Sequence, residues 1–304
     1  MRYKRMGRLT LMTRLLYILL LSFLPLQMAC AKDGNQRYKI AACDWMMLKR
    51  QKIGEFQLAK QIGADGIEMD MGGLGKRDTF DNKLHQVYFQ KQFRHTADSL
   101  GVEVPSVAMS GFFAQSFISK NNYKVLIEDC LNTMRIMGAR VAFLPLGGCG
   151  NGWHKDGSER AELLRRLHEA GEMAKADNVV IGIRTALDAK EDVKLLDEIN
   201  SEGIKIYYNF QDATDDNRDV CKELKILGKE RICQIHSSNT DSITLDKDNR
   251  INLHKVKKTL DKIGWSGWLV IERSRDISRV KDVKFNYGTN VRYLKQIFKT
   301  GIIN

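Results

Sequence analysis

The stretch GWSGWLVIERSRD, residues 264–276, joins a short apolar run directly to charged residues. The run WLVI is followed at once by Glu272 and Arg273, and Arg275 comes two positions later. A short apolar run bounded by turn residues is typical of a buried strand. A carboxylate at the end of such a strand either is solvated at the surface or faces a shared pocket. The rest of the chain decides between these two interpretations.

Seven further runs of the same kind precede this one, and longer segments with helical spacing separate them. The predicted strands occupy residues 38–43, 65–70, 102–109, 139–146, 178–184, 204–209, 231–236 and 268–272. Several of the helical segments end at a glycine suited to a left-handed cap: Gly63, Gly138, Gly203, Gly228 and Gly264. Strands that alternate with helices, without hairpin signals, predict parallel strands joined by crossover helices.

This pattern predicts an α/β fold, a closed (β/α)8 TIM barrel, in preference to an open doubly wound sheet. No linker or change of composition divides residues 32–304, which are therefore expected to form a single domain. In such a barrel the functional face lies at the carboxyl ends of the strands. The polar residues at these ends are Asp44, Glu68, Arg184, Asn209, His236 and Glu272. We expect them to surround one cavity, with Glu272 pointing into it.

The first 31 residues have the layout of a secretory signal, a basic end followed by an apolar run at 15–26 and small residues at 29–31. The apolar run is shorter than the roughly 20 residues that span a membrane. The protein is therefore predicted to be exported. Two outcomes stay open, periplasmic release after cleavage at Ala31, or attachment to the membrane through a lipid on Cys30 of a lipoprotein signal.

The net charge is largely a property of this signal. The whole chain has a formal charge of +12, and removal of the five basic residues in the first 31 leaves 12 − 5 = +7. The remaining Lys and Arg are scattered over amphipathic segments, and no basic arm interleaved with aromatic residues is present, so we expect no nucleic-acid partner. The cysteines outside the signal are widely spaced and form no CxxC pair, which argues against a zinc knuckle or a disulfide framework.

Three motifs together resemble the xylose-isomerase-like TIM-barrel family of sugar (phosphate) isomerases and epimerases. They are GADGIEMD at 63–70, ERICQIHSSNTDS at 230–242 and INLHKVKKTLDKIGWSGWLVIERSRD at 251–276. Family members commonly have a His at the end of strand seven and a GW-x-G turn before a strand that ends in Glu. The resemblance covers essentially all of residues 32–304. It implies a barrel with a small carbohydrate ligand at its strand ends.

The resemblance also implies a divalent metal, Mn, Mg or Zn, held by Glu, Asp, His and Glu at strands five to eight. The matching strand ends of this chain carry Arg184, Asn209, His236 and Glu272. The amide oxygen of Asn209 is a neutral and weaker ligand for a hard cation. Arg184 has no acceptor and cannot coordinate a metal. We therefore expect a metal site at His236, Glu272 and Asn209 that is weak or absent.

Isomerising a sugar requires a base, an acid and positive charge to stabilise an enediolate. Glu272 and His236 are the catalytic candidates, with Glu272 as base. The alternatives are that Glu272 is a structural partner of Arg184 or Arg273, and that His236 is a satisfied core residue. Arg184 has three interpretations: a counter-ion of Glu272 in a dead metal site, an anion-binding group for a carboxylated or phosphorylated sugar, or a residue misaligned by one position.

The expected substrate-binding residues lie on the same rim: Glu68, Trp153, His154, Arg184, Asn239 and Arg273. Trp153 and His154 belong to a stretch at 144–158 that resembles a lid, where they would stack on or hydrogen-bond a sugar ring. Asn239, with Asp212 and Asp241, would contact sugar hydroxyl groups.

Two hypotheses on function follow from these residues. The first is an exported carbohydrate isomerase or epimerase that acts on a free sugar, a sugar acid or an oxidised glycoside by removing a proton beside a carbonyl. The second is a catalytically inactive barrel that binds sugars. The charge of Arg184 is the feature that separates them, and the sequence does not decide whether the chain is an enzyme or what its oligomeric state is.

Overall fold

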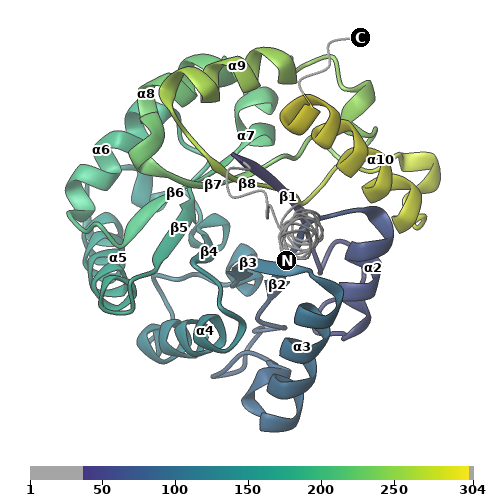
Figure 1. The fold of residues 1–304 in the computed structure, drawn as a ribbon. Coiled ribbons are helices and arrows are strands. Elements are labelled where there is room, and N and C mark those ends of the chain that lie inside the picture. Colours follow the sequence, from purple (N-terminus) through teal and green to yellow (C-terminus); the bar gives the residue numbers. More distant parts are fainter. Residues whose placement is uncertain (1–36, 301–304) are drawn as a thin grey trace, which may run out of the picture. The chain divides into compact units, whose positions relative to one another are not determined.

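The computed structural model describes residues 37–300, which form a closed barrel of parallel strands surrounded by helices (Figure 1). The strands are β1 (Tyr38–Cys43), β2 (Gly66–Asp70), β3 (Glu103–Ala108), β4 (Val141–Pro145), β5 (Val180–Arg184), β6 (Ile204–Asn209), β7 (Ile232–His236) and β8 (Gly267–Ile271). The predicted fold class and all eight predicted strands are confirmed. The predicted signal at residues 1–31, with Cys30, lies outside the described residues.

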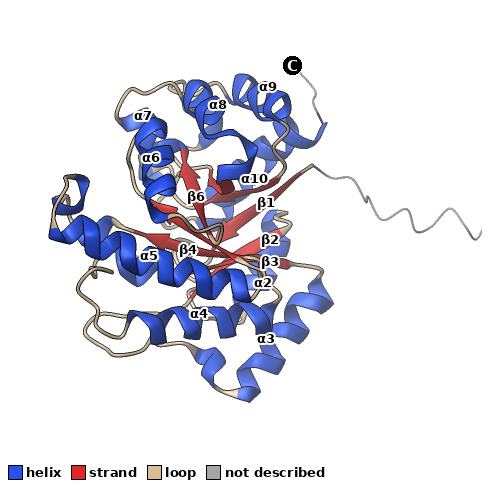
Figure 2. Cartoon of the chain, turned by 90° about the vertical axis from the view of Figure 1, so that its left-hand side faces the viewer, coloured by secondary structure: helices blue, strands red, loops and turns tan. Residues whose placement is uncertain are grey.

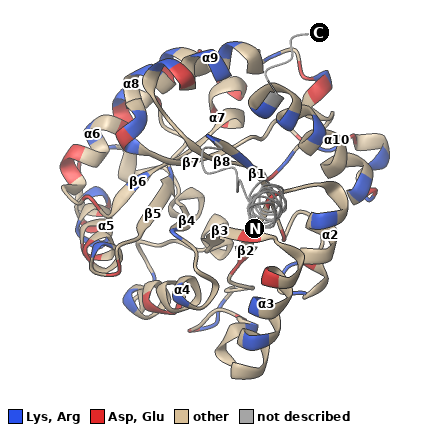
Figure 3. Cartoon of the chain, viewed as in Figure 1, with Lys and Arg blue, Asp and Glu red and all other residues tan. Residues whose placement is uncertain are grey.

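The helices cover the outside of the barrel, and the strands lie within them (Figure 2). They are α2 (Gly54–Ile62), α3 (Val87–Leu100), α4 (Tyr123–Met137), α5 (Ser158–Ala176), α6 (Ala189–Ile199), α7 (Phe210–Asp215), α8 (Val220–Arg231), α9 (Leu253–Ile263) and α10 (Val283–Lys295). Within the described range, no helix is long and apolar enough to cross a membrane. Basic and acidic residues are interspersed along outer helices such as α5 and α8 (Figure 3).

Each strand pairs with the next in the sequence, and β1 closes the barrel against β8. Five residue pairs make this closure, from Tyr38 opposite Gly267 to Ala42 opposite Ile271. Asn209 and His236 lie opposite each other at the ends of β6 and β7. The carboxyl ends of all strands therefore lie on one rim, which brings residues that are far apart in sequence into contact.

Side-chain alternation divides the buried residues into two layers. Ile40, Ile67 and Leu269 belong to the larger apolar layer between strands and helices. Phe143 and Tyr207 belong to a smaller group inside the barrel. Polar side chains share this interior, because Glu68, Ser106, Gln234 and His236 are also buried at 0–1% exposure. The barrel centre thus holds a polar network that the apolar strand patterns alone do not predict.

Two predicted helix caps differ from the structure. Gly228, at φ 67° and ψ 176°, interrupts α8 and does not end it, and Gly203 does not cap α6. Gly63, Gly138 and Gly264 take the left-handed cap as expected, but α6 ends earlier than Gly203. Asn200, at φ 52°, caps it instead. A Cβ on Gly203 would lie 1.9 Å from the carbonyl oxygen of Gly171 in α5. Glycine at position 203 therefore permits α5 to approach the start of β6, and it does not end a helix.

Candidate functional site at the carboxyl ends of the strands

Three strand-end side chains converge on a single oxygen atom of a fourth residue, Oε2 of Glu272. Arg184 Nη1 lies 3.2 Å from this oxygen, and Asn209 Nδ2 lies 3.4 Å from it. His236 Nδ1 lies 3.6 Å away. These residues end β5, β6 and β7, and Glu272 directly follows β8. The apolar run quoted above therefore ends on a carboxylate because that carboxylate faces a cluster of side chains in the barrel mouth and is not solvated.

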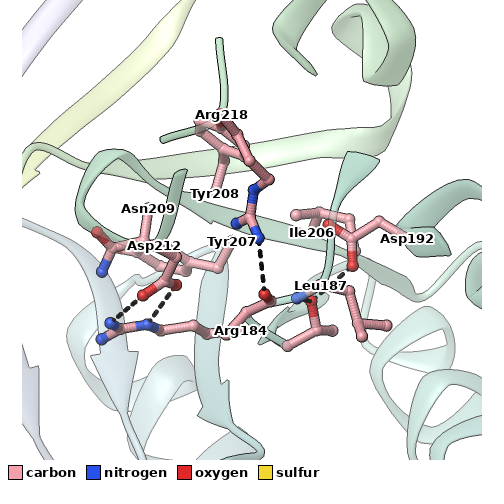
Figure 4. A pocket seen from close by; sticks show the side chains of 11 residues that line it. Arg184, Leu187, Asp192, Ile206, Tyr207, Tyr208, Asn209, Asp212 and Arg218 are labelled. Carbon is pink, nitrogen blue, oxygen red and sulfur yellow. Dashed lines mark hydrogen bonds and ion pairs between the residues drawn. The ribbon is translucent and has the colours of Figure 1, made fainter. Parts of the chain in front are cut away.

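Arg184 is held by two carboxylates at once. Its Nε and Nη2 form a bidentate pair with Asp212 at 2.8 and 2.6 Å (Figure 4). Its Nη1 contacts Glu272 at 3.2 Å. Its guanidinium also lies over the ring of Phe113, at 5.5 Å from the ring centre. Burial alone would lower the pKa of Arg184, but the charges of Glu272 and Asp212 outweigh burial and raise it. The structure thus places Arg184 as the counter-ion of Glu272.

Asn209 does not offer its oxygen to the site. Its side-chain oxygen accepts a hydrogen bond from the backbone N–H of Gln211 at 2.8 Å and so caps the first turn of α7. Its amide nitrogen faces Glu272. The expectation that Asn209 lends an oxygen to a cation therefore has no support in this geometry, because the oxygen already satisfies a helix N-terminus.

Glu68 lies beneath the mouth and is completely buried. Its Oε1 is 2.7 Å from His236 Nε2, and its Oε2 accepts hydrogen bonds from Ser106 at 2.6 Å and Tyr207 at 2.5 Å. Gln234 donates to the hydroxyl groups of Ser106 and Tyr207, each at 2.8 Å. Both carboxylate oxygens of Glu68 are thus hydrogen-bonded, and the side chain has no exposed surface. Glu68 orients His236 and does not contact a sugar in this conformation, which corrects its expected role as a substrate-binding residue.

His236 is a different case from an ordinary core histidine. One ring nitrogen is bound to Glu68, but Nδ1 is buried and has no hydrogen-bond partner among the described residues. This nitrogen points toward Glu272. A carboxylate on one nitrogen fixes the orientation of an imidazole and leaves the other nitrogen to accept or deliver a proton. His236 therefore has the geometry of an acid or base beside Glu272.

Two accessible aromatic residues flank this cluster, and the sequence analysis missed both. Half-buried Trp45 stacks on Phe143, with 6.4 Å between ring centres and an interplanar angle of 7°, and meets His236 edge-on at 6.5 Å. Phe113, which covers Arg184, is 38% exposed. Side-chain alternation could have indicated Trp45, since it has the same parity as the inward-facing Ala41. No sequence signal indicates Phe113.

The predicted aromatic lid is wrong for Trp153. This residue lies in a short 3-10 turn (Gly152–His154) and is only 1% exposed, so its ring packs in the apolar core. Its backbone oxygen accepts a hydrogen bond from Arg160 at 3.2 Å. His154 is exposed, and its ring contacts Trp153 at 4.3 Å. Burial in the core leaves Trp153 unable to stack on a sugar in this conformation.

The remaining predicted rim residues serve the loops around the mouth. Asn239 is buried, and its amide donates to the backbone oxygen of Ile243 at 3.1 Å. Arg273 has an exposed side chain, and its backbone N–H donates to the hydroxyl of Ser238 at 3.2 Å. Neither side chain has a described contact with Glu272. Asn239 therefore shapes the loop after β7, and Arg273 remains available to solvent.

The prediction that Asp44 faces the cavity is wrong. Ala41 and Cys43 face the barrel interior, so alternation turns Asp44 outward, toward α2. Its carboxylate accepts hydrogen bonds from the backbone N–H groups of Gln51 at 3.1 Å and Asp70 at 3.2 Å. Asp44 thus belongs to a separate buried group outside the barrel.

This group contains three fully buried carboxyl groups, those of Asp44, Glu55 and Asp70. Burial, with help from the charge of Asp70, raises the pKa of Asp44 to about 8. Burial also raises the pKa of Glu55 well above its ordinary range. The pKa of Asp70 rises to about 6 through burial, although Arg50, 3.1 Å away, lowers it. The group therefore retains protons that exposed carboxyl groups release at neutral pH.

We expect the free energy of unfolding to fall as the pH rises from about 5 to about 9. An unfolded carboxyl group has a pKa of about 4. The stabilisation from the protons on Asp70 and Asp44 is therefore complete below that pH and is lost as the pH rises through about 6 and about 8. Asp44→Asn cannot ionise and is expected to remove about 4 kcal/mol of this fall, because about three pH units separate pH 5 from the pKa of about 8 and each is worth about 1.4 kcal/mol. Urea unfolding across the pH range measures this difference.

Asp197→Asn, at an exposed position of α6, is the control and is expected to keep the wild-type pH dependence. The Asp44 variant retains part of the fall, because burial raises the pKa of Asp192 to about 8 as well. A wild-type stability that is constant over this pH range, or an unchanged pH dependence in Asp44→Asn, would contradict the prediction.

The residues present do not fit a divalent cation. Across residues 37–300, no group of three or more His, Cys, Asp or Glu side chains is arranged to hold a metal ion. Arg184 Nη1 lies 3.2 Å from Glu272 Oε2, the same oxygen that His236 Nδ1 approaches at 3.6 Å. Asn209 presents N–H to the same oxygen. A fixed positive charge and an N–H donor thus occupy the positions from which ligands would approach a cation.

A small cavity of about 10 Å³ lies beside Arg184, between the ends of β5 and β6 (Figure 4). Asp192, Tyr208 and Arg218 also line this cavity. This volume is enough for about one water molecule. A sugar would therefore approach Arg184 from the mouth of the barrel, where Trp45 and Phe113 are accessible.

Comparisons with known proteins agree with this architecture. A family model described as a xylose isomerase-like TIM barrel matches residues 56–297. A D-psicose 3-epimerase from Clostridium cellulolyticum H10, solved with D-tagatose, superimposes with a TM-score of 0.69 at 13% identity, covering 86% of this chain and 99% of its own. A D-psicose 3-epimerase solved in the presence of D-fructose gives 0.68 at 11% identity, with coverage of 86% and 99%. The search of curated proteins found no match.

A third similar structure is the apo form of 3-keto-D-glucoside 4-epimerase from E. coli. It superimposes with a TM-score of 0.67 at 14% identity, and the match covers 85% of this chain and 99% of the other. At these identities the likeness concerns the fold, so the side chains at the mouth must be interpreted on their own geometry.

Proposed function

The chain belongs to the xylose isomerase-like TIM-barrel family, and on that premise we propose that it is a metal-independent sugar isomerase- or epimerase-like protein. In this proposal a small carbohydrate binds at the barrel mouth, where Trp45 and Phe113 present accessible aromatic surface. The single observation that carries the proposal is the meeting of Arg184, His236 and Glu272 at one oxygen. A cation, an acid and a base thus lie within reach of one reacting centre.

The chemistry follows from these three groups. Glu272 removes a proton from the carbon beside the sugar carbonyl, and the carbonyl oxygen takes up the electron pair to form an enediolate. Arg184 stabilises this negative charge by hydrogen bonds and Coulomb attraction. His236 delivers a proton to the oxygen of the former carbonyl and takes one from the hydroxyl group on the carbon that Glu272 deprotonated, so that this group becomes the new carbonyl. Glu272 returns its proton to the carbon of the former carbonyl. The sum is an aldose–ketose isomerisation in which no atom is gained or lost.

The geometry favours isomerisation with one base over epimerisation with two. Epimerisation by two bases requires a second proton acceptor on the opposite face of the sugar. The end of β5 carries Arg184, which stays protonated and cannot accept a proton. Glu272 and His236 lie on the same side of the mouth, so a proton removed by Glu272 is returned to the same face.

A second function, a non-catalytic sugar-binding barrel, is favoured by one observation. Glu272 is only 2% exposed, and Arg184 and Asn209 both approach its Oε2. A carboxylate that is held by two donors and shielded from solvent is less accessible to a proton on a bound sugar. The same mouth would then bind a sugar without removing its proton.

Deuterium exchange separates the two functions. The full chain, treated with EDTA, is incubated in D₂O with a panel of aldoses and ketoses, and NMR follows loss of the proton beside the carbonyl. An active protein exchanges this proton, and Glu272→Gln lowers the rate by about 100-fold or more. Glu230→Gln, at an exposed position with a side-chain exposure of 77%, is the control. Sugar binding without exchange supports the second function, and absence of any sugar binding contradicts both.

We further propose that the protein acts outside the cytoplasm, either in the periplasm or as a membrane-anchored lipoprotein. The support is the basic, apolar and small-residue order of residues 1–31. N-terminal sequencing of native protein is expected to begin near Ala31 or Lys32, or to find lipid-modified Cys30. Native material that retains Arg2 to Arg14 would contradict export.

A further inference from the structure

We infer that Asp212 makes the barrel mouth selective for uncharged sugars, against sugar acids and sugar phosphates. This inference rests on the proposed function, because it concerns the ligand of the same site. Arg184 is the cation that a substrate anion would use, and its Nε and Nη2 already bind the two oxygens of Asp212 at 2.8 and 2.6 Å. A carboxylate or phosphate would form a bidentate pair with these same two nitrogen atoms. Asp212 thus occupies the place of a substrate anion.

The net charge around Arg184 supports the same selectivity. Two carboxylates, those of Asp212 and Glu272, contact the guanidinium of Arg184, so this cluster carries a net charge of −2 + 1 = −1. Only 15% of the Asp212 side chain and 16% of the Arg184 side chain are exposed, so solvent screens these charges incompletely. An anionic sugar would therefore be repelled by this cluster.

A neutral sugar can still use Arg184. A guanidinium has five N–H groups, and the contacts with Asp212 and Glu272 engage three of them. The other two can donate to a carbonyl or hydroxyl oxygen. The pair with Asp212 therefore removes the capacity to bind an anion while it leaves the capacity to hold a neutral oxygen atom.

The neighbouring arginines of the rim are paired in the same manner, with one exception. Arg275 binds Asp241 through Nε at 3.0 Å, and Arg50 binds Asp70 at 3.1 Å. Arg273 is exposed and has no ion pair among the described residues. It is the one rim arginine of the three that could attract an anion without displacing a carboxylate, so it needs its own variant in the test.

The test compares D-galactose with D-galacturonate, and D-fructose with fructose 6-phosphate, by isothermal titration calorimetry on the full chain. The wild type is expected to bind each neutral sugar at least about tenfold more tightly than its anionic counterpart. Asp212→Asn, which keeps the size and loses the charge, is expected to raise the affinity for the anion about tenfold relative to the affinity for the neutral sugar. Asp216→Asn, 60% exposed and without a contact to Arg184, is the control.

Salt provides a readout that needs no variant. Repulsion at the mouth predicts that the affinity of wild type for the anion rises when NaCl increases from about 50 to about 500 mM, because salt screens like charges. Wild-type preference for the anion overturns the inference, and so does an anion affinity unchanged in folded Asp212→Asn. If Arg273→Ala alone abolishes anion binding by wild type, Arg273 and not Arg184 governs selectivity, which also overturns it. Absence of binding by either sugar class overturns the proposed function itself.

Discussion

Arg184→Glu combined with Asn209→Asp is expected to create a site for Mn²⁺ or Zn²⁺, with affinity at least about a thousandfold above wild type. The wild-type chain is expected to be isolated without a stoichiometric metal at this position. The double variant replaces a guanidinium by a carboxylate beside Glu272 and frees Asp212, which now binds Arg184 at 2.6 Å. His236 Nδ1 already lies 3.6 Å from Glu272 and has no hydrogen-bond partner among the described residues.

The magnitude follows from Coulomb attraction. Two unit charges about 4 Å apart interact by about 1 kcal/mol in water and about 4 kcal/mol at an effective dielectric of 20. The double variant changes the charge around a divalent ion by three units, two at position 184 and one at position 209. Even a value close to that of water gives about 4 kcal/mol or more, which corresponds to about a thousandfold in affinity.

Metal content by mass spectrometry and titration calorimetry measure this outcome. Asn209→Asp alone keeps the guanidinium and is expected to bind metal weakly, while Arg184→Gln removes the charge without adding a ligand and is expected to be intermediate. A tight native metal on His236 and Glu272, located by anomalous scattering, would contradict the prediction. So would a folded double variant that gains no affinity.

Glu68→Ala is expected to destabilise the fold by about 3–5 kcal/mol, because it leaves several buried polar groups without their shared acceptor. The change leaves His236, Ser106 and Tyr207 without the acceptor that they share, in a barrel interior where Glu68 has no exposed surface. Unsatisfied buried donors cost about 1–3 kcal/mol each when they cannot reach water. Thermal unfolding is expected to shift downward by roughly 10 °C.

The control for this prediction is Glu103→Ala. Glu103 is an exposed carboxylate at the amino end of β3, and it pairs with Lys39 of β1. An exposed pair contributes about 0–1 kcal/mol, so this variant is expected to unfold close to wild type. Glu68→Gln keeps one acceptor oxygen, and its free energy of unfolding is expected to lie between those of Glu68→Ala and Glu103→Ala. A Glu68→Ala protein within about 1 kcal/mol of wild type would show that the network adds no stability.

Much of the fold was predictable because it depends on local periodic patterns. Apolar runs, helical spacing and glycine caps all act over a few residues, and they placed every strand within two residues of its observed bounds. The rule that strand ends share one rim then brought Arg184, Asn209, His236 and Glu272 together from the sequence alone. One glycine was assigned the wrong role because the reason for it lies in a distant part of the chain. Gly203 is a glycine because α5 approaches it, which the sequence around it does not reveal.

The details of the site were decided by tertiary structure. Asp44 and Trp153 were assigned to the mouth because of their positions in the sequence, but alternation along β1 and burial in the core direct them elsewhere. Phe113 borders the mouth because of the course of its loop, whereas the position of Trp45 continues the alternation of β1.

The amino-acid pattern was enough to predict the barrel, its family and the residues at the strand ends. The partners of Arg184 became clear only in the folded chain, where it binds both Asp212, 28 residues away, and Glu272, 88 residues away. The two kinds of information differ in the distance along the chain over which they act. Hydrophobic periodicity depends on residues that are neighbours in the sequence. The pairing of buried charges depends on the distances between side chains after the barrel has closed. A difference of a few ångströms decides whether an arginine at the end of β5 is free to bind an anion or is already neutralised.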